Sequence, residues 1–532
     1  MAYAMQFLLL LASAATIAPA NSAPSWLPNF WIKMMGTRLD IPFVYEEATI
    51  AGIQEAFDGG RLTSVQLVKY YLDQINSVNP SLHAVQEVNP DALSDAARCD
   101  SQRATITGAA SRRSPLHGIP ILIKDNINTR DRLNTTSGSF ALLGSVVRGD
   151  AAVIDRLRRA GAILLGKATM SEWDHFRALS PPQGWSPRGG QGKSPYPGTV
   201  NPCGTSSGSA IAVAANIVTV ALGTDLDGAI TCPSTTNSVV GIKPTVGVTS
   251  RSGVVPISNR LDTVGPMART VADAVAVLDV IAGFDPRDSS ATRAGEKYIP
   301  AGGFRRFLKA DGLKGKRIGI LSRRFDDFEE KSAEAAIFAR FFDIMRNKGA
   351  TVINDLEIRG VEQMSDPAAS GEAAELLAEF KVSLEAYLAD LISSPVRTLA
   401  DIIAFNNHHK EEERTEEFGQ IIFLESEKTK GVGPLEKSAI NRMVRLSKEG
   451  MEMLMAEKGL DALVFPNNVI HHALAIGGFP LISVPAGYAE SGAPFGITFA
   501  GAVGSDAKLI EIAYAFEQAT RARKPPPPPP LS

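Results

Sequence analysis

Two kinds of hydrophobic pattern alternate along the first part of the chain. Apolar residues recur at helical spacing over about 46–106 and again over 152–160, which predicts helices there. Short continuous apolar runs at 116–124 and 162–165 are typical of buried strands. This alternation predicts the α/β class, with a mixed β-sheet core that helices cover on both faces.

A long irregular segment interrupts the pattern at 181–205. It is rich in Gly, Pro, Ser and Asn, and a loop of this length inside a compact domain is usually functional or disordered. A helix over 206–215 and a strand over 218–222 are expected to follow, and residues 226–233 are again irregular. We therefore look for the chemistry of the protein around these loops.

The second half of the chain has a different character. Charged helical segments dominate residues 310–440, which we interpret as a peripheral helical region. No internal repeat is evident, and we expect a single domain over 46–520. Apolar runs that predict returning core strands occur at 461–466, 481–485 and 494–501.

The two ends of the chain lie outside this domain. An apolar run at 5–17 is followed by Ala-Pro-Ala at 18–20, so residues 1–20 are expected to be a signal peptide for the secretory pathway, with an extracellular, vacuolar or ER-lumenal destination. The run is too short to span a bilayer, and no later segment reaches that length without polar breaks. Residues 521–532 form a Pro-rich tail, expected to be a solvated polyproline stub.

Composition limits the partners. The 532 residues are 44% hydrophobic and carry a net charge of −3, so no basic field exists to hold phosphates and nucleic acid is not an expected partner. The chain has 7 histidines but no HExxH or paired CxxC motif, so the sequence predicts no metal site. Three cysteines, Cys99, Cys203 and Cys232, are too few for a disulfide framework, although one bridge is possible.

Several sequence motifs, in order and at matching spacing, resemble those of the amidase signature family. The resemblance covers roughly residues 46–520 and is closest to the plant members and the bacterial peptide amidases. It implies the amidase-signature fold. The motifs are HGIPILIKDN at 117–126, GTSSGSA at 204–210, GTDLDGAI at 223–230, GIKPT at 241–245, GFP at 478–480 and VPAG at 484–487.

Members of that family hydrolyse amides with a serine nucleophile, a second serine on a cis peptide bond and a lysine. The resemblance implies that Lys124 is the base, in a neutral form that burial favours. It places Thr205 at the position of the second serine, which relays the proton. Threonine keeps the hydroxyl group but adds a methyl group that restricts its rotamers. Ser206 is a second hydroxyl if the loop register differs, and otherwise belongs to the start of a helix.

Ala229 stands at the position of the nucleophile, and this is the decisive departure from the family. A methyl group cannot attack a carbonyl or hold an acyl group, so the usual amide hydrolysis is expected to be lost or rerouted. The oxyanion hole consists of backbone amides, which survive such a change. The resemblance assigns the amides of Leu226, Asp227, Gly228 and Ala229 to this hole, and Asp225 is expected to hold their loop by hydrogen bonds.

Neighbouring side chains are poor replacements for the missing serine. Thr231 and Cys232 follow Ala229 by two and three positions, and this displacement moves an attacking atom several ångströms from the oxyanion donors. Cys203 has a similar problem, and we interpret both cysteines as small packing residues. Direct attack by Thr205 remains an alternative.

Three functions remain open. The first is a neofunctionalised enzyme, as in plant specialised metabolism, that uses Lys124 and the oxyanion hole for non-hydrolytic chemistry on a nitrogenous or carbonyl-containing small metabolite. The second is a pseudoenzyme that binds amide or acyl ligands. The third is an amidase, a carbon–nitrogen hydrolase, still active through Thr205 or a nearby residue. An engineered change at Ala229 is less convincing, because Thr205 is a second departure. The family chemistry implies a small-molecule ligand and no cofactor, and the sequence predicts no oligomeric state.

Overall fold

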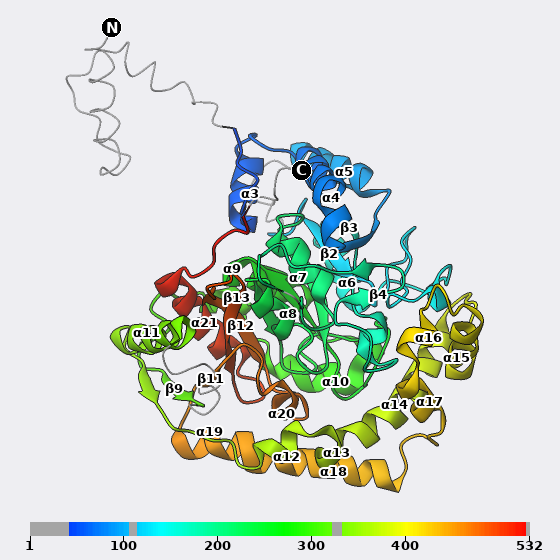
Figure 1. Ribbon diagram of the computed structural model, residues 1–532. Helices are drawn as coiled ribbons and strands as arrows, with labels where there is room; N and C mark the ends of the chain where they lie inside the picture. The colour runs from blue at the N-terminus through cyan, green and yellow to red at the C-terminus, as the bar shows by residue number, and fades with distance from the viewer. Residues whose placement is uncertain (1–41, 106–113, 200, 322–331, 528–532) are drawn as a thin grey trace, which may run out of the picture. The chain divides into compact units, whose positions relative to one another are not determined.

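The computed structural model describes residues 42–105, 114–199, 201–321 and 332–527 (Figure 1). Contacts divide the chain into Met1–Phe43 and Val44–Ser532, and every element named below lies in the second unit. The expected signal peptide falls outside the described residues, as do the last five residues of the Pro-rich tail. In the described parts of the chain, no helix has the length and apolar character needed to cross a bilayer.

The core is one mixed sheet of 11 strands in the order β1-β3-β2-β6-β8-β7-β12-β13-β11-β9-β10. Strands β3, β2 and β6 run parallel to one another, and so do β11, β9 and β10, whereas the pairs in the centre of the sheet are antiparallel. The strands are β1 (Val85–Val88), β2 (Pro120–Lys124), β3 (Ile163–Ala168), β6 (Val220–Asp225), β7 (Val240–Lys243), β8 (Thr263–Ala268), β9 (Arg317–Ile320), β10 (Thr351–Ile353), β11 (Ala462–Pro466), β12 (Leu481–Tyr488) and β13 (Pro494–Ala500), with a separate pair β4 (Trp185–Ser186) and β5 (Gly190–Gln191).

Helices cover both faces of this sheet, which confirms the predicted α/β class. Helix α7 packs on β6, α9 on β8, and α8 and α21 on β12. Strands β2, β3 and β6 are buried along their whole length, as the continuous apolar runs predict. The helices outside the layer described below are α3 (Ile50–Asp58), α4 (Ser64–Leu82), α5 (Ala92–Thr105), α6 (Ala152–Arg159), α7 (Ser207–Ala214), α8 (Thr231–Thr236), α9 (Val271–Ile281), α10 (Ser289–Gly295), α11 (Ala333–Asn347), α20 (His471–Ala475) and α21 (Asp506–Thr520).

The N-terminal stretch is less uniformly helical than its periodicity suggests. Strand β1 lies within it and pairs antiparallel with β3, and its residues change from buried at Val85 to exposed at Val88. Helix α4 begins at a capping box in which Thr63 accepts from the amide of Gln66. It includes Pro80 and ends at Leu82.

The region 310–440 is only partly helical. It opens with β9 and β10, the two strands at one edge of the sheet, with α11 between them in sequence. The helices that follow form a layer in which α14 packs against α17 and α18 (Figure 1). Its members are α12 (Val361–Ser365), α13 (Pro367–Ser370), α14 (Glu372–Asp390), α15 (Leu399–His408), α16 (Thr415–Phe418), α17 (Ile421–Glu427), α18 (Pro434–Ser447) and α19 (Met453–Lys458).

Candidate active site

Lys124 is the centre of a buried polar network at the end of β2. Its side chain is fully buried, and its Nζ atom donates to Thr205 Oγ1 at 2.7 Å, to Thr224 Oγ1 at 2.7 Å and to Asp174 Oδ1 at 2.5 Å. The structure thus brings together Lys124 and Thr205, which are 81 residues apart in sequence. It also adds a carboxylate that the sequence motifs do not contain.

Asp174 reaches this network from an unusual turn. Trp173, Asp174 and His175 all adopt left-handed backbone conformations, with φ of 50°, 52° and 64°. Non-glycine residues rarely adopt this conformation, so three in succession are held there by their surroundings. The carboxylate accepts from Lys124 and from Thr205 Oγ1 at 2.6 Å on one oxygen, and from Asn126 Nδ2 at 2.9 Å on the other.

Two opposing effects set the proton affinity of Lys124. Burial lowers the pKa of its ammonium group, and the adjacent carboxylate of Asp174 opposes this shift. Burial is the larger effect, so the pKa lies below its usual value. Asp174 nevertheless raises the pKa of Lys124 above that of the same buried lysine without a carboxylate partner, so less of Lys124 is in the neutral form that can accept a proton.

The hydroxyl groups that follow Gly204 have different environments. Thr205 lies at the cavity with its Oγ1 between Lys124 and Asp174. Ser206 is fully buried and donates to the carbonyl of Thr224 at 2.9 Å, so it fixes the start of α7 to β6. The described residues contain no cis peptide bond, which differs from the bond implied at Thr205 by the resemblance. The relay role of Thr205 stays a prediction.

The loop after β6 carries Ala229 and is held by Asp225. The carboxylate of Asp225 accepts from the amide of Gly228 at 2.9 Å and from the amide of Ile230 at 2.6 Å. The amide of Gly228 is therefore engaged within the loop. An oxyanion role for the amides of Leu226, Asp227 and Ala229 stays a prediction.

A cavity of about 330 Å³ lies over this loop. Thr205, Asp174 and Ala229 line it, whereas Lys124 is not part of the lining and contacts Thr205 and Asp174 from the core side. The assignment of Ala229 to the nucleophile position stays a prediction. The other walls of the cavity include Phe176, Val254, Ile257, Leu376 and His471.

A second carboxylic acid faces the same cavity. Asp262 precedes β8 and accepts from the amides of Ile257 at 2.9 Å and Ser258 at 3.0 Å. Burial raises its pKa to about 7, the negative charge of Asp174 adds to this rise, and the two amides oppose it. The cavity thus contains one carboxylate paired with a lysine and one carboxyl group that titrates near neutrality.

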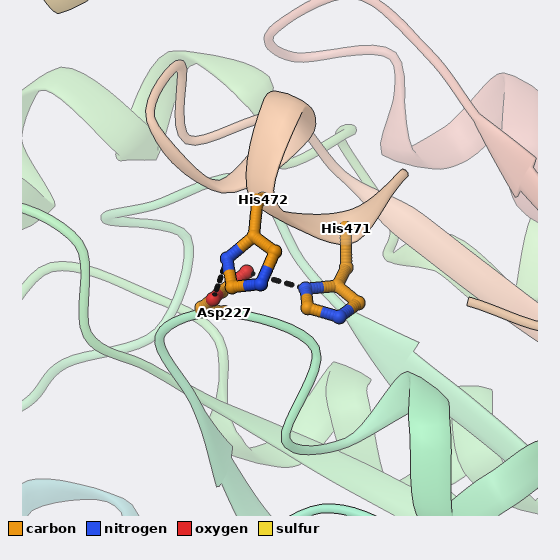
Figure 2. A group of neighbouring side chains, drawn as sticks. All are labelled: Asp227, His471 and His472. Atoms are coloured by element: carbon orange, nitrogen blue, oxygen red, sulfur yellow. Dashed lines mark hydrogen bonds and ion pairs between the residues drawn. The ribbon is translucent and has the colours of Figure 1, made fainter. Parts of the chain in front are cut away.

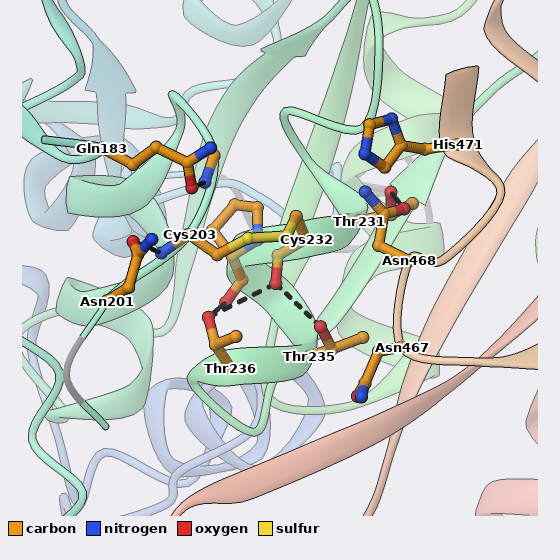
Figure 3. The surroundings of a disulfide bond; sticks show 12 residues. Gln183, Asn201, Cys203, Thr231, Cys232, Thr235, Thr236, Asn467, Asn468 and His471 are labelled. Carbon is orange, nitrogen blue, oxygen red and sulfur yellow. Dashed lines mark hydrogen bonds between the residues drawn. A yellow bond between two sulfur atoms is a disulfide. The ribbon is translucent and has the colours of Figure 1, made fainter. Parts of the chain in front are cut away.

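A disulfide joins the two loops of the site (Figure 3). Cys203 lies two residues before Thr205, and Cys232 lies in the first turn of α8, three residues after Ala229. Their Cα atoms are 5.6 Å apart. The two cysteines are therefore cross-linked rather than separate packing residues, and neither is available as a thiolate nucleophile. Cys99, the third, is buried and free.

Sequence reasoning missed Asp174 and Asp262. Asp174 lies in the segment SEWDHF, which has no distinctive periodicity, and its role depends on a backbone turn. Asp262 belongs to a loop and resembles any solvated aspartate in the sequence. The side-chain partners of Asp174 lie at least 31 residues away, and the raised pKa of Asp262 comes mainly from burial in the folded chain, so no local signal identifies either residue.

Comparisons with known proteins agree with this geometry. The amidase family profile matches residues 66–477. A probable amidase of Arabidopsis thaliana is 52% identical over 488 residues, which is 92% of this chain and 93% of that protein.

Solved structures give the same result. The native peptide amidase of Stenotrophomonas maltophilia matches with a TM-score of 0.83 and 42% identity, covering 91% of this chain and 99% of that one. An amidase family protein of Bacillus anthracis also has a TM-score of 0.83, with 32% identity and coverage of 94% and 95%. The similarity therefore extends over almost the whole of these chains.

Proposed function

This chain belongs to the amidase family, and from that premise we propose that it has exchanged serine-based amide hydrolysis for non-hydrolytic chemistry on a carbonyl-containing small metabolite. The observation that carries this proposal is the ion pair between Lys124 and Asp174. This pair lies next to a cavity that is lined by Ala229, the residue at the predicted position of the nucleophile.

The ion pair argues against the hydrolytic relay of the family. In that relay the lysine must accept the proton of a hydroxyl group. Here the Asp174 carboxylate holds the proton on Lys124 and also accepts from Thr205. The hydroxyl of Thr205 is therefore directed toward a carboxylate. With a methyl group at position 229, no attacking oxygen stands beside the loop amides.

The remaining groups suit proton transfer next to a carbonyl. A general acid or base is most effective when its pKa lies near the working pH, and the pKa of Asp262 is about 7. Asp174, in contrast, has a lysine partner that stabilises its charge. Two carboxyl groups in one cavity with such different environments are suited to different roles.

The proposed reaction begins with the substrate carbonyl oxygen bound at the amides of Leu226, Asp227 and Ala229. The Asp262 carboxylate accepts a proton from the carbon next to the carbonyl, and the electron pair of that C–H bond moves onto the carbonyl oxygen as an enolate. The loop amides stabilise this anion. The enolate then expels a leaving group, which takes the proton back from Asp262. Alternatively, its carbon attacks a second carbonyl carbon of the same molecule; as the ring C–C bond forms, the C=O π electrons move to that oxygen, which takes the proton from Asp262.

One comparison tests the loss of hydrolysis. The purified protein, Ala229→Ser and Lys124→Ala are assayed on a panel of simple amides and esters. We expect no hydrolysis by the native protein above the Lys124→Ala blank. Native hydrolysis that disappears in Lys124→Ala would contradict the proposal and identify an active amidase.

A second assay tests the proposed proton transfer directly. Small carbonyl metabolites are incubated with the protein in D2O, and the exchange of hydrogen for deuterium next to the carbonyl is followed by mass spectrometry. We expect exchange for a subset of compounds with the native protein and its loss in Asp262→Asn. Exchange that continues unchanged in Asp262→Asn would remove Asp262 from the mechanism.

The names of the relatives favour a second function, amide hydrolysis. The contact of Thr205 with Lys124, at the cavity surface, gives this alternative a candidate nucleophile. Thr205→Ser should then retain hydrolysis and Thr205→Val should abolish it. In the proposed non-hydrolytic enzyme, neither variant has amidase activity to change.

A further inference from the structure

A second polar cluster lies on another wall of the cavity. The carboxylate of Asp227 contacts the rings of both His471 and His472, which lie next to each other (Figure 2). His471 Nδ1 is 2.7 Å from Asp227 Oδ1, and His472 Nδ1 contacts the other carboxylate oxygen. His471 and His472 are the first two residues of α20. His471 is 244 residues from Asp227 in sequence, so no local motif contains these three side chains.

The three side chains have the composition and spacing of a metal site. Each offers one donor atom, and these atoms all lie within 4.8 Å of one another. Two imidazoles with one carboxylate are the protein ligands of many catalytic zinc sites, which keep a further position open for water or substrate. The same set of ligands also binds other divalent transition metals.

The environment of Glu372 is a second observation in favour of a cation at this wall. Its side chain is 1% exposed, and neither carboxylate oxygen has a hydrogen-bond partner. The charges of Asp227 and His472 both act on Glu372, so this group lies beside the cluster. The nearby Arg260 is bonded to Glu375 and to the carbonyl of Ile476 instead.

The carboxylates of Asp227 and Glu372 at this wall of the cavity are only partly compensated by the positive groups around them. A buried carboxylate without a partner costs several kcal/mol, so such groups are normally paired, protonated or bound to metal. Asp227 obtains partial compensation from its contacts with His471 and His472. Glu372 obtains none from a hydrogen bond. A divalent cation at the histidines would compensate both carboxylates.

We propose that Asp227, His471 and His472 bind a divalent transition-metal ion, zinc in the first instance, with Glu372 as an adjacent carboxylate that supports the site. The ion faces the cavity that Thr205 and Ala229 also line, so its open position is accessible to a substrate oxygen. A metal ion there acts as a Lewis acid on a carbonyl group. The binding site stands on its own ligands and does not depend on the proposed reaction.

Metal binding is measured without any assay of turnover. The full chain is stripped with a chelator and titrated with Zn²⁺ by calorimetry, and bound zinc is counted by mass spectrometry after dialysis. Cobalt(II) is then added to the stripped protein, and its visible absorption reports nitrogen and oxygen ligands in a low-symmetry site. We expect one equivalent of zinc and a cobalt spectrum for the native protein.

The variants separate this site from adventitious binding. His471→Gln/His472→Gln should lose the bound zinc. His408→Ala/His409→Ala removes the other adjacent histidine pair of the chain, at the end of α15, and should retain it. Glu372→Gln should weaken zinc binding by roughly tenfold, as expected for a residue that supports the ligands.

Two results would overturn the proposal. The first is a native protein that takes up no zinc and gives no cobalt spectrum. The second is zinc binding that persists in His471→Gln/His472→Gln. If the double variant does not fold, Asp227→Asn and the native cobalt spectrum decide the question. In either negative case the cluster is a hydrogen-bonded clamp between α20 and the loop after β6.

Discussion

The Nζ atom of Lys124 lies 2.5 Å from Oδ1 of Asp174, and the hydroxyl of Thr205 bonds to both groups. Lys124, the residue that we predict to be the base, is therefore part of an ion pair. Under the proposed function, this ion pair and Ala229 are the two departures from serine-based hydrolysis.

Removal of Asp174 should leave more of Lys124 in the neutral form that can accept a proton. Without this carboxylate, the largest opposition to burial is gone and the pKa of Lys124 should fall further. We expect Ala229→Ser/Asp174→Ala to hydrolyse simple amides at least about 100-fold faster than Ala229→Ser, which is the usual contribution of a competent base. Initial rates at neutral pH measure this difference. Ala229→Ser/Lys124→Ala is the inactive control, and equal rates for Ala229→Ser with and without Asp174 would contradict the role given to the ion pair.

Asp262 should make the protein less stable as the pH rises. Its pKa is about 7 in the folded chain and about 3.9 in an unfolded chain, so the folded state binds the proton more tightly. Stability is therefore highest below about pH 4 for this group and is lost as the pH rises toward 7, by at most about 4 kcal/mol. Urea unfolding at pH 5 and pH 8 should show a smaller loss for Asp262→Asn than for the native protein.

The matched control for this titration is Asp390→Asn, because Asp390 has an exposed side chain that pairs only with Arg148 on the surface. It should reproduce the native difference between pH 5 and pH 8. An identical difference in Asp262→Asn would show that the buried carboxyl group titrates elsewhere.

The bond between Cys203 and Cys232 should stabilise the site against unfolding. It closes a loop with a sequence separation of 29 and so restricts the unfolded chain, for which about 3–4 kcal/mol is expected. A reducing agent should lower the Tm of the native protein and of Cys99→Ala. It should have no effect on Cys203→Ala/Cys232→Ala, whose Tm should already be low. A reductant effect that survives in the double variant would rule out this bridge as its cause.

Gly228 should be indispensable for the geometry of the Asp227 loop. Its φ is +80°, and an added Cβ atom would lie 2.2 Å from Nδ2 of Asn468 and 3.0 Å from Cγ of His471. Gly144 has a φ of +79° with no atom within 4 Å of such a Cβ. An alanine there therefore measures the free-energy cost of the left-handed backbone conformation without steric overlap. Gly144→Ala should destabilise the chain by about 1 kcal/mol, and Gly228→Ala by 1–3 kcal/mol more from steric overlap.

Gly228→Ala should also weaken zinc binding, because the new methyl group displaces His471. Unfolding in urea and zinc titration measure the two effects. Equal stability and equal zinc affinity in the two alanine variants would contradict the close packing of Gly228 against α20.

Several buried strands of the sheet were predictable from sequence. The apolar runs of β2, β3, β11, β12 and β13 are continuous and stand out against their surroundings. Strand β1 was not predicted, because an edge strand of four residues with mixed exposure looks like part of a helical stretch. Strand β8 was also not predicted, since Gly265 and Pro266 break its apolar pattern.

The candidate site was predictable only as far as its motifs extend. Lys124, Thr205 and Ala229 lie in sequence motifs, whereas Asp174, His471 and His472 join them through the fold. Their chemistry depends on approaches between segments far apart in the chain, such as the 244 residues between Asp227 and His471. Contacts between segments so far apart in the chain cannot be predicted from the pattern of a single sequence.

Trp173, next to Asp174 in the left-handed turn, is fully buried and packs edge-on against Phe423 of α17, with ring centroids 5.7 Å apart. Phe423 in turn stacks on Phe380 of α14. The aromatic ring thus anchors the acidic side chain beside it, and the anchor is embedded in the outer helical layer. Substitutions of Phe423 or Phe380 would therefore change the position of Asp174 beside Lys124 without changing a residue that lines the cavity. Natural variation in the outer helices could alter the site in this indirect way.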